Sequence, residues 1–317
     1  MSKLIITDGY TLNSGDLSWN LLEAFGEVVL YDRTAPSEVS DRCREASVII
    51  TNKTPVTRET IAAAKDLKVI AVTATGYNIV DVAAAAERHI PVCNVPGYGT
   101  DSVAQHTFAL LLELTNHVGL NAATVSRGDW SGSKDFCYTA KPLVEISGKT
   151  LGIVGFGRIG QKVGEIAHAF GVNVVYQSNH TVPSTYAKPV SLETLFSTSD
   201  FISLHCPLKA DNQEFVNASL LSKMKPGACL INTSRGQLIR ERDLADALIS
   251  NRIGGAALDV LSAEPPPADH PLVGLSNCLI TPHNAWMSVE ARQRIMSTTI
   301  ENVRQALQGN PVNVVNR

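Results

Sequence analysis

The stretch Gly155-Phe156-Gly157-Arg158-Ile159-Gly160 lies near the middle of the 317-residue chain. An apolar run at 151–154 precedes it, and a helix-like segment extends from 158 to about 170. This strand–turn–helix context is what a Gly-x-Gly-x-x-Gly motif needs to bind a dinucleotide. The first glycine permits a tight turn, the second lets the backbone approach a pyrophosphate, and the third lets helix and strand pack closely. The stretch therefore predicts a dinucleotide-binding site, with phosphates at the positive end of the helix.

On both sides of this motif, short apolar runs alternate with segments of helical length. Ahead of it we expect strands at 4–7, 28–31, 48–51, 69–73 and 91–94, separated by helices at 17–25, 37–45, 57–64 and 80–88. After it we expect strands near 151–154, 172–176, 201–204, 228–231, 255–258 and 278–281, and a last helix at 289–307. This alternation predicts an α/β fold with parallel sheets covered by helices.

The central position of the motif indicates two domains, because a chain of this length holds about two. The segment 101–127 predicts one long helix, capped by Asp101 or Ser102, and its run at 108–112 is apolar nearly all round, as in a buried helix. We expect a flavodoxin-like substrate domain of residues 1–100 and 287–317, and a Rossmann dinucleotide-binding domain of residues 101–286. Both would be doubly wound parallel sheets.

The composition argues against several classes of protein. A net charge of −3 disfavours a nucleic-acid surface or a polybasic membrane contact. No apolar run approaches the ~20 residues of a membrane helix, and the N-terminus turns polar too soon for a signal peptide. The six cysteines are scattered without a Cys-x-x-Cys pair, which favours reduced thiols over disulfides or metal ligands. We expect a cytoplasmic protein without a metal, a nucleic-acid partner or a membrane contact.

Three segments that follow predicted strands carry side chains suited to catalysis, namely Arg235, Glu264 and His283. Taken singly, each has a structural explanation as a surface ion pair, a solvated acid or a turn histidine. However, ligands of open α/β sheets bind beyond the carboxyl ends of the strands, so the three should converge in one crevice. There His283 would exchange a proton with a carbonyl or hydroxyl oxygen, and Glu264 would fix its tautomer. Arg235 would hold a carboxylate with its planar fork.

The chain resembles D-isomer-specific 2-hydroxyacid dehydrogenases over nearly its full length. The motifs that carry the resemblance are 149–160, His205-Cys206-Pro207-Leu208, Asn232-Thr233-Ser234-Arg235-Gly236, Leu258-Asp259-Val260 with Glu264-Pro265, and Thr281-Pro282-His283. The resemblance implies that Arg235, Glu264 and His283 are the catalytic set. It implies that NAD(H) or NADP(H) is bound by Gly155, Gly157, Arg158, Ile159, Gly160, Gln177, Cys206, Pro207, Thr233 and Asp259. It also implies that the substrate contacts Thr75, Gly76, Tyr77, Arg235, His283 and Trp286.

Within that family, the segments 73–78, 131–138 and 283–286 are similar to those of glycerate dehydrogenases, also called hydroxypyruvate reductases. This implies reduction of hydroxypyruvate or glyoxylate to D-glycerate or glycolate. Trp286 either walls the substrate pocket or is a domain-interface aromatic. Two alternatives stay open: another D-2-hydroxyacid dehydrogenase, of the D-lactate or phosphoglycerate type, and a corepressor-like protein that binds the dinucleotide without catalysis.

One position departs from the family pattern. NAD-specific members carry an acid at the end of the second strand, about 20 residues past the glycines, that binds the ribose hydroxyls. Here Gln177 occupies that place. A neutral amide does not repel a 2′-phosphate, so we expect weakened discrimination between NADH and NADPH.

The segment 101–127 and the aromatic stretch 130–138 suggest a buried surface. The resemblance implies a homodimer packed through this region. The alternative is that both segments pack between the two domains.

Overall fold

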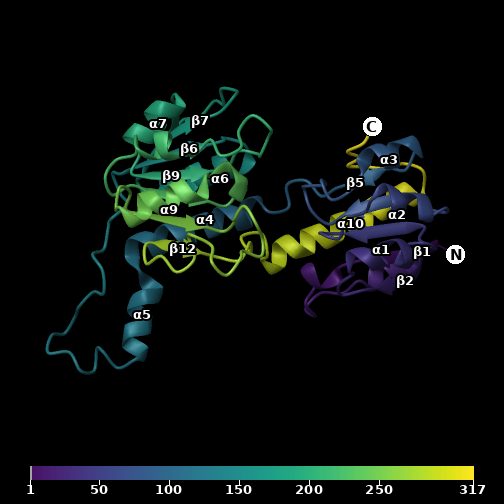
Figure 1. Ribbon diagram of the computed structural model, residues 1–317, viewed down its shortest axis with the longest axis horizontal. Helices are drawn as coiled ribbons and strands as arrows, with labels where there is room; N and C mark the ends of the chain where they lie inside the picture. The colour runs from purple at the N-terminus through teal and green to yellow at the C-terminus, as the bar shows by residue number, and fades with distance from the viewer. Residues whose placement is uncertain (1) are drawn as a thin grey trace. The chain divides into compact units, whose positions relative to one another are not determined.

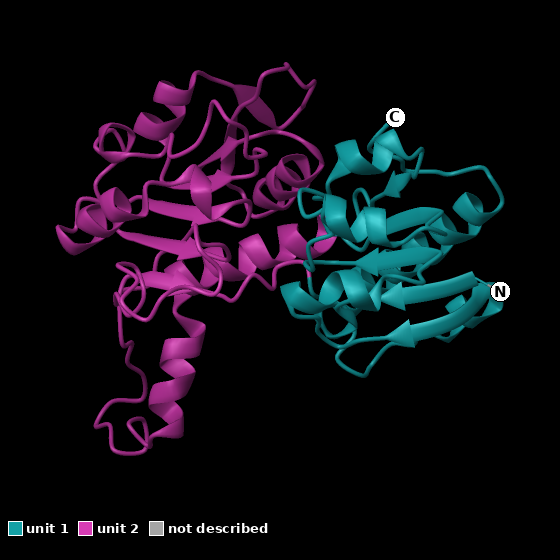
Figure 2. Cartoon of the chain, turned by 45° about the vertical axis from the view of Figure 1, so that its right-hand side comes forward, with its two compact units in different colours: residues 1–99, 287–317 teal, residues 100–286 magenta. Residues whose placement is uncertain are grey.

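The structure is a computed structural model that describes residues 2–317. The chain divides into two compact units (Figure 2). Unit 1 runs up to Gly99 and takes in Met287–Arg317 as well, whereas unit 2 is formed by Thr100–Trp286. Each unit is built on its own parallel sheet (Figure 1).

Unit 1 contains a five-stranded sheet in the order β2-β1-β3-β4-β5. This is the flavodoxin-like order of a doubly wound sheet, as predicted. The strands are β1 (Ser2–Ile6), β2 (Gly26–Leu30), β3 (Val48–Thr51), β4 (Val69–Val72) and β5 (Val92–Cys93). The helices are α1 (Val39–Arg42), α2 (Arg58–Ala63), α3 (Val82–Glu87) and α10 (Val289–Leu307), and α10 packs against β4.

One buried carboxylate ties two strand ends of unit 1 together. Asp8 follows β1 and is 6% exposed. Its Oδ1 accepts a hydrogen bond from the Asn52 amide at 2.9 Å, and its Oδ2 accepts from the Lys53 and Thr54 amides at 2.6 and 2.8 Å. Because three consecutive amides after β3 bind one side chain, the carboxyl ends of β1 and β3 are locked together.

Unit 2 contains a seven-stranded parallel sheet in the order β12-β11-β10-β9-β6-β7-β8. The strands are β6 (Thr150–Val154), β7 (Asn173–Gln177), β8 (Ala187–Pro189), β9 (Phe201–Leu204), β10 (Cys229–Asn232), β11 (Gly255–Leu258) and β12 (Cys278–Ile280). The helices are α4 (Thr100–Asn116), α5 (Val118–Ser126), α6 (Arg158–Ala169), α7 (Leu192–Thr198), α8 (Ala218–Leu221) and α9 (Glu241–Ile249). The order reverses direction between β6 and β9, as in a Rossmann fold with an added strand.

Side chains of successive residues in the unit 2 strands belong to two different hydrophobic clusters, one on each face of the sheet. Leu230 belongs to one hydrophobic cluster, with residues of α7 and α9, whereas Ile231 belongs to another, with residues of α4 and α6. This follows from the alternation of side chains along a strand. Because both faces of the sheet are covered, its strands are almost continuously apolar and polar groups are left at the strand ends.

Three predictions about elements were wrong. The helix expected at 101–127 is broken at His117, whose φ is 48°, into α4 and α5. Asp101 and Ser102 lie inside the first turn of α4 rather than at its cap. The segment expected as a helix at 17–25 contains only a 3₁₀-helix, Asn20–Phe25. The edge strand β8 was not predicted, since a three-residue strand with two exposed positions has no apolar pattern to detect. Among the described residues, no helix is long and apolar enough to cross a membrane.

Candidate active site

The three glycines of the motif have different surroundings. Gly155 has φ 93°, and a Cβ there would lie 2.4 Å from the backbone nitrogen of Cys206. A Cβ on Gly160 would lie 2.2 Å from the Gly155 carbonyl oxygen. By contrast, a Cβ on Gly157 would meet nothing within 4 Å. Backbone therefore fills the space at Gly155 and Gly160, whereas the space over Gly157 is open.

The open space at Gly157 fits a dinucleotide phosphate. Gly157 is the N-cap of α6, and Arg158 at the first position of that helix is exposed like it. Ile159 is half-buried behind them. Amides at the start of a helix bind anions, and the helix dipole adds to this attraction. The absence of a side chain at Gly157 lets an anion reach these amides.

Other predicted cofactor residues lie at the carboxyl ends of β7, β9 and β10. Gln177 ends β7, is half-buried, and its carbonyl accepts a hydrogen bond from the Gly155 amide at 2.8 Å. Cys206 and Pro207 follow β9, and Thr233 follows β10. These residues thus lie at the carboxyl edge of neighbouring strands, where the strand order reverses and open α/β sheets bind ligands.

The structure brings Glu264 and His283 into direct contact. The Nδ1 atom of His283 lies 2.6 Å from Oε2 of Glu264. The second carboxylate oxygen, Oε1, accepts a hydrogen bond from the Leu261 amide at 3.0 Å, which holds the carboxylate in place. The imidazole keeps 30% of its surface exposed. A carboxylate on one ring nitrogen fixes the tautomer and leaves Nε2 as the nitrogen that can exchange a proton with a ligand.

Arg235 lies in a turn that packs onto the loop carrying Glu264. The Asn232 side chain holds this turn, because its Nδ2 donates to the Arg235 carbonyl at 2.8 Å and its Oδ1 accepts from the Ser234 amide at 2.9 Å. A Cβ on Gly236 would lie 1.9 Å from the carbonyl carbon of Leu261. Only glycine allows this close approach. The Arg235 guanidinium is exposed and donates to the Ser234 carbonyl at 2.7 Å.

Asp259 is almost completely buried, with 1% of its surface exposed. Its Oδ1 accepts from the Thr281 hydroxyl at 2.6 Å and the Asn284 amide at 3.0 Å, and its Oδ2 accepts from the Ala285 amide at 3.0 Å. The Asp259 carbonyl accepts from the His283 amide at 2.9 Å. Asp259 therefore holds the loop that carries His283, in which His283 itself has a left-handed φ of 52°.

A second histidine near the strand ends differs from His283. Burial lowers the pKa of His205 to about 3, and its Nε2 lies 2.8 Å from the Ser203 hydroxyl. Burial thus favours its neutral form, which makes His205 a poor proton donor. Burial also raises the pKa of the neighbouring Cys206 thiol, which keeps that residue an uncharged part of the wall.

Glu241 of α9 holds the loop that carries Glu264, and no motif in the sequence predicts this role. Its Oε1 accepts from the Ser262 amide at 2.7 Å, and its Oε2 lies 3.1 Å from Nε2 of the buried His270. Both partners belong to the loop that carries Glu264. No spacing rule links these positions, which are 21 and 29 residues apart, so only the folded chain reveals the contact.

The predicted substrate loop Thr75-Gly76-Tyr77 lies in unit 1, after β4. The Thr75 hydroxyl donates to the Val95 carbonyl at 2.8 Å, and the Tyr77 carbonyl accepts from the Val80 amide at 3.0 Å. Trp286 is half-buried at the end of unit 2. The part of this loop in substrate binding stays a prediction.

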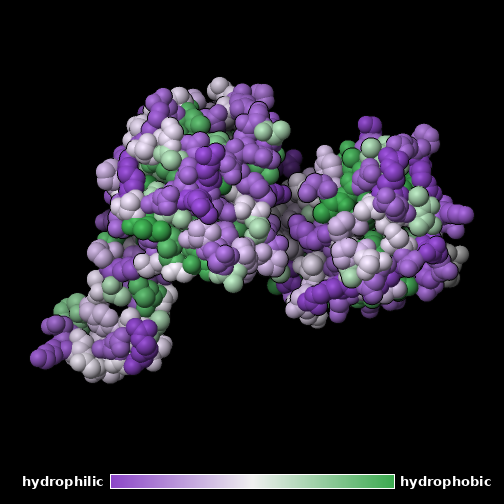
Figure 3. All heavy atoms as spheres, in the orientation of Figure 1, coloured by the Kyte–Doolittle hydropathy of each residue, from purple (hydrophilic) through white to green (hydrophobic). Residues whose placement is uncertain are grey.

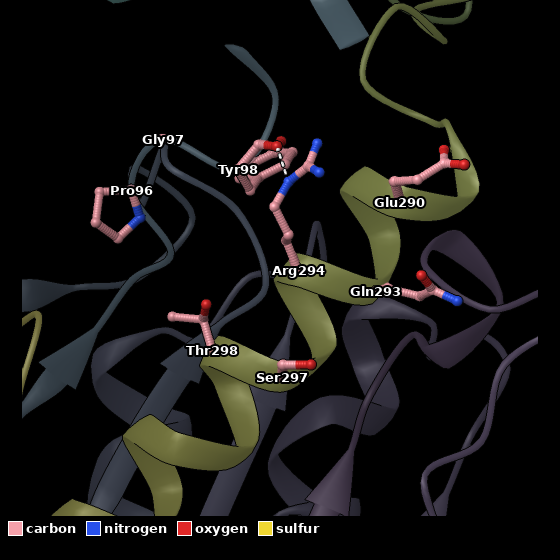
Figure 4. Close-up of a pocket in the computed structure, with 8 residues that line it drawn as sticks. All are labelled: Pro96, Gly97, Tyr98, Glu290, Gln293, Arg294, Ser297 and Thr298. Carbon is pink, nitrogen blue, oxygen red and sulfur yellow. Dashed lines mark hydrogen bonds between the residues drawn. The ribbon is translucent and has the colours of Figure 1, made fainter. Parts of the chain in front are cut away.

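A shallow cavity of about 410 Å³ opens in unit 1 between the 96–98 segment and α10 (Figure 4). Arg294 crosses it and donates from Nε to the Tyr98 carbonyl at 2.8 Å. None of the predicted site residues lines this cavity.

Comparison with known proteins gives a consistent result. A family model for the NAD-binding domain of D-isomer-specific 2-hydroxyacid dehydrogenases matches residues 108–285. The chain is 46% identical to a hydroxypyruvate reductase of Blautia hydrogenotrophica, covering 99% of this chain and 100% of the relative. It is 38% identical to a glycerate dehydrogenase of Methylorubrum extorquens, covering 99% of this chain and 98% of that one.

Solved structures agree in fold over the whole chain. A protein of Thermus thermophilus superimposes with a TM-score of 0.89 at 36% identity, over 99% of both chains. An acyclic imino acid reductase in complex with NADPH and D-Arg superimposes with a TM-score of 0.85 at 34% identity, again over 99% of both. With the family model and the relatives above, these matches show that the chain belongs to the D-isomer-specific 2-hydroxyacid dehydrogenase family, an oxidoreductase family with a nicotinamide dinucleotide cofactor.

Proposed function

We propose that the protein reduces a small 2-keto acid, such as hydroxypyruvate or glyoxylate, to the D-2-hydroxy acid. The observation that carries the proposal is the 2.6 Å contact of His283 with Glu264, at strand ends of the same unit as the glycine loop. The names of the two relatives, a hydroxypyruvate reductase and a glycerate dehydrogenase, support this choice of substrate.

The catalytic roles follow from the chemistry of the three side chains. The cofactor supplies the hydride when it is bound. His283, protonated at Nε2, donates that proton to the substrate carbonyl oxygen, and in the reverse direction neutral His283 takes the hydroxyl proton. Glu264 accepts the Nδ1 hydrogen and orients the ring. Arg235 binds the substrate carboxylate through paired N–H groups and polarises the carbonyl.

The reaction is tested by loss of absorbance at 340 nm when reduced cofactor is mixed with a panel of 2-keto acids. We expect the fastest turnover with hydroxypyruvate or glyoxylate. Faster turnover with pyruvate would favour a D-lactate dehydrogenase, and faster turnover with phosphohydroxypyruvate would favour the phosphoglycerate type. If no 2-keto acid of the panel causes a loss of absorbance although the cofactor binds, the result would favour a corepressor-like binding protein.

Gln177 is proposed to weaken the choice between NADH and NADPH. It ends β7 at the place where an acid would repel a 2′-phosphate. We expect kcat/KM values for the two cofactors that differ by much less than a thousandfold, and we expect Gln177→Asp to shift the ratio toward NADH. A thousandfold preference of the unaltered protein for NADH would contradict the proposal.

We propose that the protein is a homodimer that packs through the arm formed by residues 118–144. In this arm α5 and a returning loop project from the sheet of unit 2 (Figures 1 and 2). The arm is tied internally, because the Asn121 side chain accepts from the Ala140 amide at 3.0 Å. Its surface mixes hydrophobic and hydrophilic residues (Figure 3), and it exposes large apolar side chains, with Val118 63% and Phe136 89% exposed. A second copy would cover these side chains, which a monomer rarely leaves in water.

Light scattering tests the dimer. We expect twice the 34.0 kDa chain mass for the unaltered protein and a monomer for the double variant Val118→Asp, Phe136→Asp. The matched control is Leu21→Asp, at a comparably exposed apolar residue outside the arm. A monomeric unaltered protein, or a dimer that survives the double variant, would contradict the arm as the interface.

We propose a cytoplasmic location on the basis of the thiols. The six cysteines are free, and burial raises the pKa of Cys43 and Cys278 to about 12. Such protonated, unpaired thiols suit a reducing compartment.

A further inference from the structure

One face of α4 carries polar side chains that bond to the loop that holds His283. The Ser102 hydroxyl donates to the Ala285 carbonyl at 2.9 Å. His106, one turn further on, places Nε2 3.0 Å from the Thr281 hydroxyl. Residues four apart lie on the same helix face, so these two contacts are stacked along one line. The helix therefore reaches the His283 loop at two points, before and after His283 itself.

The hydrogen-bond directions at His106 can be assigned. The Thr281 hydroxyl has one hydrogen, and Oδ1 of Asp259 lies 2.6 Å from it, the shortest of the carboxylate's contacts. A hydroxyl that donates to a carboxylate is left with acceptor positions only. Nε2 of His106 must therefore carry the hydrogen that it shares with Thr281. The same nitrogen lies 3.5 Å from Oδ1 of Asp259. The chain of donors thus runs from His106 through Thr281 to Asp259.

This chain of bonds ends on the backbone of the proton-transferring loop. The Asp259 carboxylate accepts from the Asn284 and Ala285 amides, immediately after His283. His283 has a positive φ, a conformation that costs a non-glycine residue of order 1–3 kcal/mol and persists only where its surroundings enforce it. The bonds from Asp259 provide that constraint, and the orientation of Asp259 depends on Thr281.

We propose that His106 is a positioning residue for the reaction, acting on His283 through Thr281 and Asp259. The inference rests on the proposed function, because it assumes that His283 transfers the proton. His106 itself is separated from that proton by the buried carboxylate, so it does not exchange it. A small displacement of a catalytic group costs rate much more than it costs binding. Loss of the His106 hydrogen bond should therefore lower kcat and leave KM and cofactor affinity nearly unchanged.

The test uses matched substitutions in the full chain. His106→Leu removes the donor, whereas His106→Gln keeps an N–H group at a similar reach. His168→Leu, on the exposed surface of α6 in the same unit, is the control for replacing a helix histidine. We expect kcat to fall about 10- to 100-fold in His106→Leu, to recover to within about threefold in His106→Gln, and to stay unchanged in His168→Leu. The Kd for reduced cofactor should change less than twofold throughout.

A double-mutant cycle tests whether His106 acts through Thr281. Thr281→Val breaks the chain of bonds, and Thr281→Ser preserves it. If the two residues act in series, the double variant His106→Leu, Thr281→Val loses no more rate than either single variant. Additive losses, or a normal kcat in His106→Leu, would overturn the proposal. The Thr281 pair also keeps the test decisive should His106→Leu fail to fold.

Imidazole NMR separates this inference from the proposed function, because it needs no turnover. In the unaltered protein, the ring of His106 should carry hydrogen on Nε2. In His106→Leu and Thr281→Val, the ring resonances of His283 should move while those of His270 stay. Unmoved His283 resonances contradict the positioning role, whereas failure to reduce any 2-keto acid contradicts the proposed function alone.

Discussion

Replacing His283 with alanine should lower kcat by about a hundredfold or more, because general acid catalysis contributes about 10²–10⁴ to rates of this kind. The folded unit should survive, since the imidazole is partly exposed and its contact is with Glu264 on a loop. Single-turnover measurement with saturating cofactor and 2-keto acid isolates the chemical step. An unchanged rate would show that another group supplies the proton, and the neutral His205 is a poor candidate for that role.

Replacing Arg235 with alanine gives the contrasting pattern. The guanidinium binds the substrate carboxylate in both the ground state and the transition state, so KM should rise strongly while kcat also falls. Arg235→Lys keeps the charge but loses the planar fork, and it should recover only part of the affinity. A normal KM in Arg235→Ala would show that Arg235 does not bind the substrate.

Two substitutions in the glycine loop should have opposite effects on stability and binding. Gly160→Ala places a methyl group 2.2 Å from the Gly155 carbonyl oxygen, so it should destabilise unit 2 by about 1–3 kcal/mol or more. Gly157→Ala meets no protein atom within 4 Å, so stability without cofactor should stay within about 0.5 kcal/mol. Its methyl group instead enters the space where a phosphate would approach the start of α6.

Denaturant unfolding without cofactor, combined with fluorescence titration of NADH and NADPH, measures both quantities. We expect Gly157→Ala to weaken both cofactors by more than tenfold, because the close approach of backbone and phosphate is lost. If Gly157→Ala binds both cofactors with unchanged affinity, the phosphate does not bind at Gly157. Undiminished stability in Gly160→Ala would mean that helix and strand can separate without cost.

Much of the fold could be predicted from the sequence because its strands are buried on both faces. Such strands are apolar runs of four or five residues, and β3, β9 and β11 begin and end where the runs do. The last helix, α10, was predicted with the bounds it has, since Ser288 caps it and Gly309 with Pro311 follows its end. These signals are local, so a single chain is enough to read them.

The features that escaped prediction depend on contacts between distant residues. The break at His117 lies in a polar part of the segment, two residues before Gly119, but the apolar run at 108–112 favoured one continuous helix. The residues that position the catalytic side chains are harder still to predict. Asp259 and Thr281 are 22 residues apart, and His106 lies 175 residues from Thr281. No motif or spacing links His106 to the catalytic loop, and only the folded chain places it next to Thr281.

The carboxylate of Asp8 makes the two units chemically unequal. Both sheets are doubly wound, and in each the end of a strand beside the reversal point offers backbone amides that suit an anion. In unit 1 these amides, from Asn52 to Thr54, already bind an anion that is part of the chain. A nucleotide phosphate would have to displace a buried side chain to bind there. Unit 1 thus keeps the architecture of a nucleotide-binding domain with its anion site internally saturated, which directs a dinucleotide to one place in each chain.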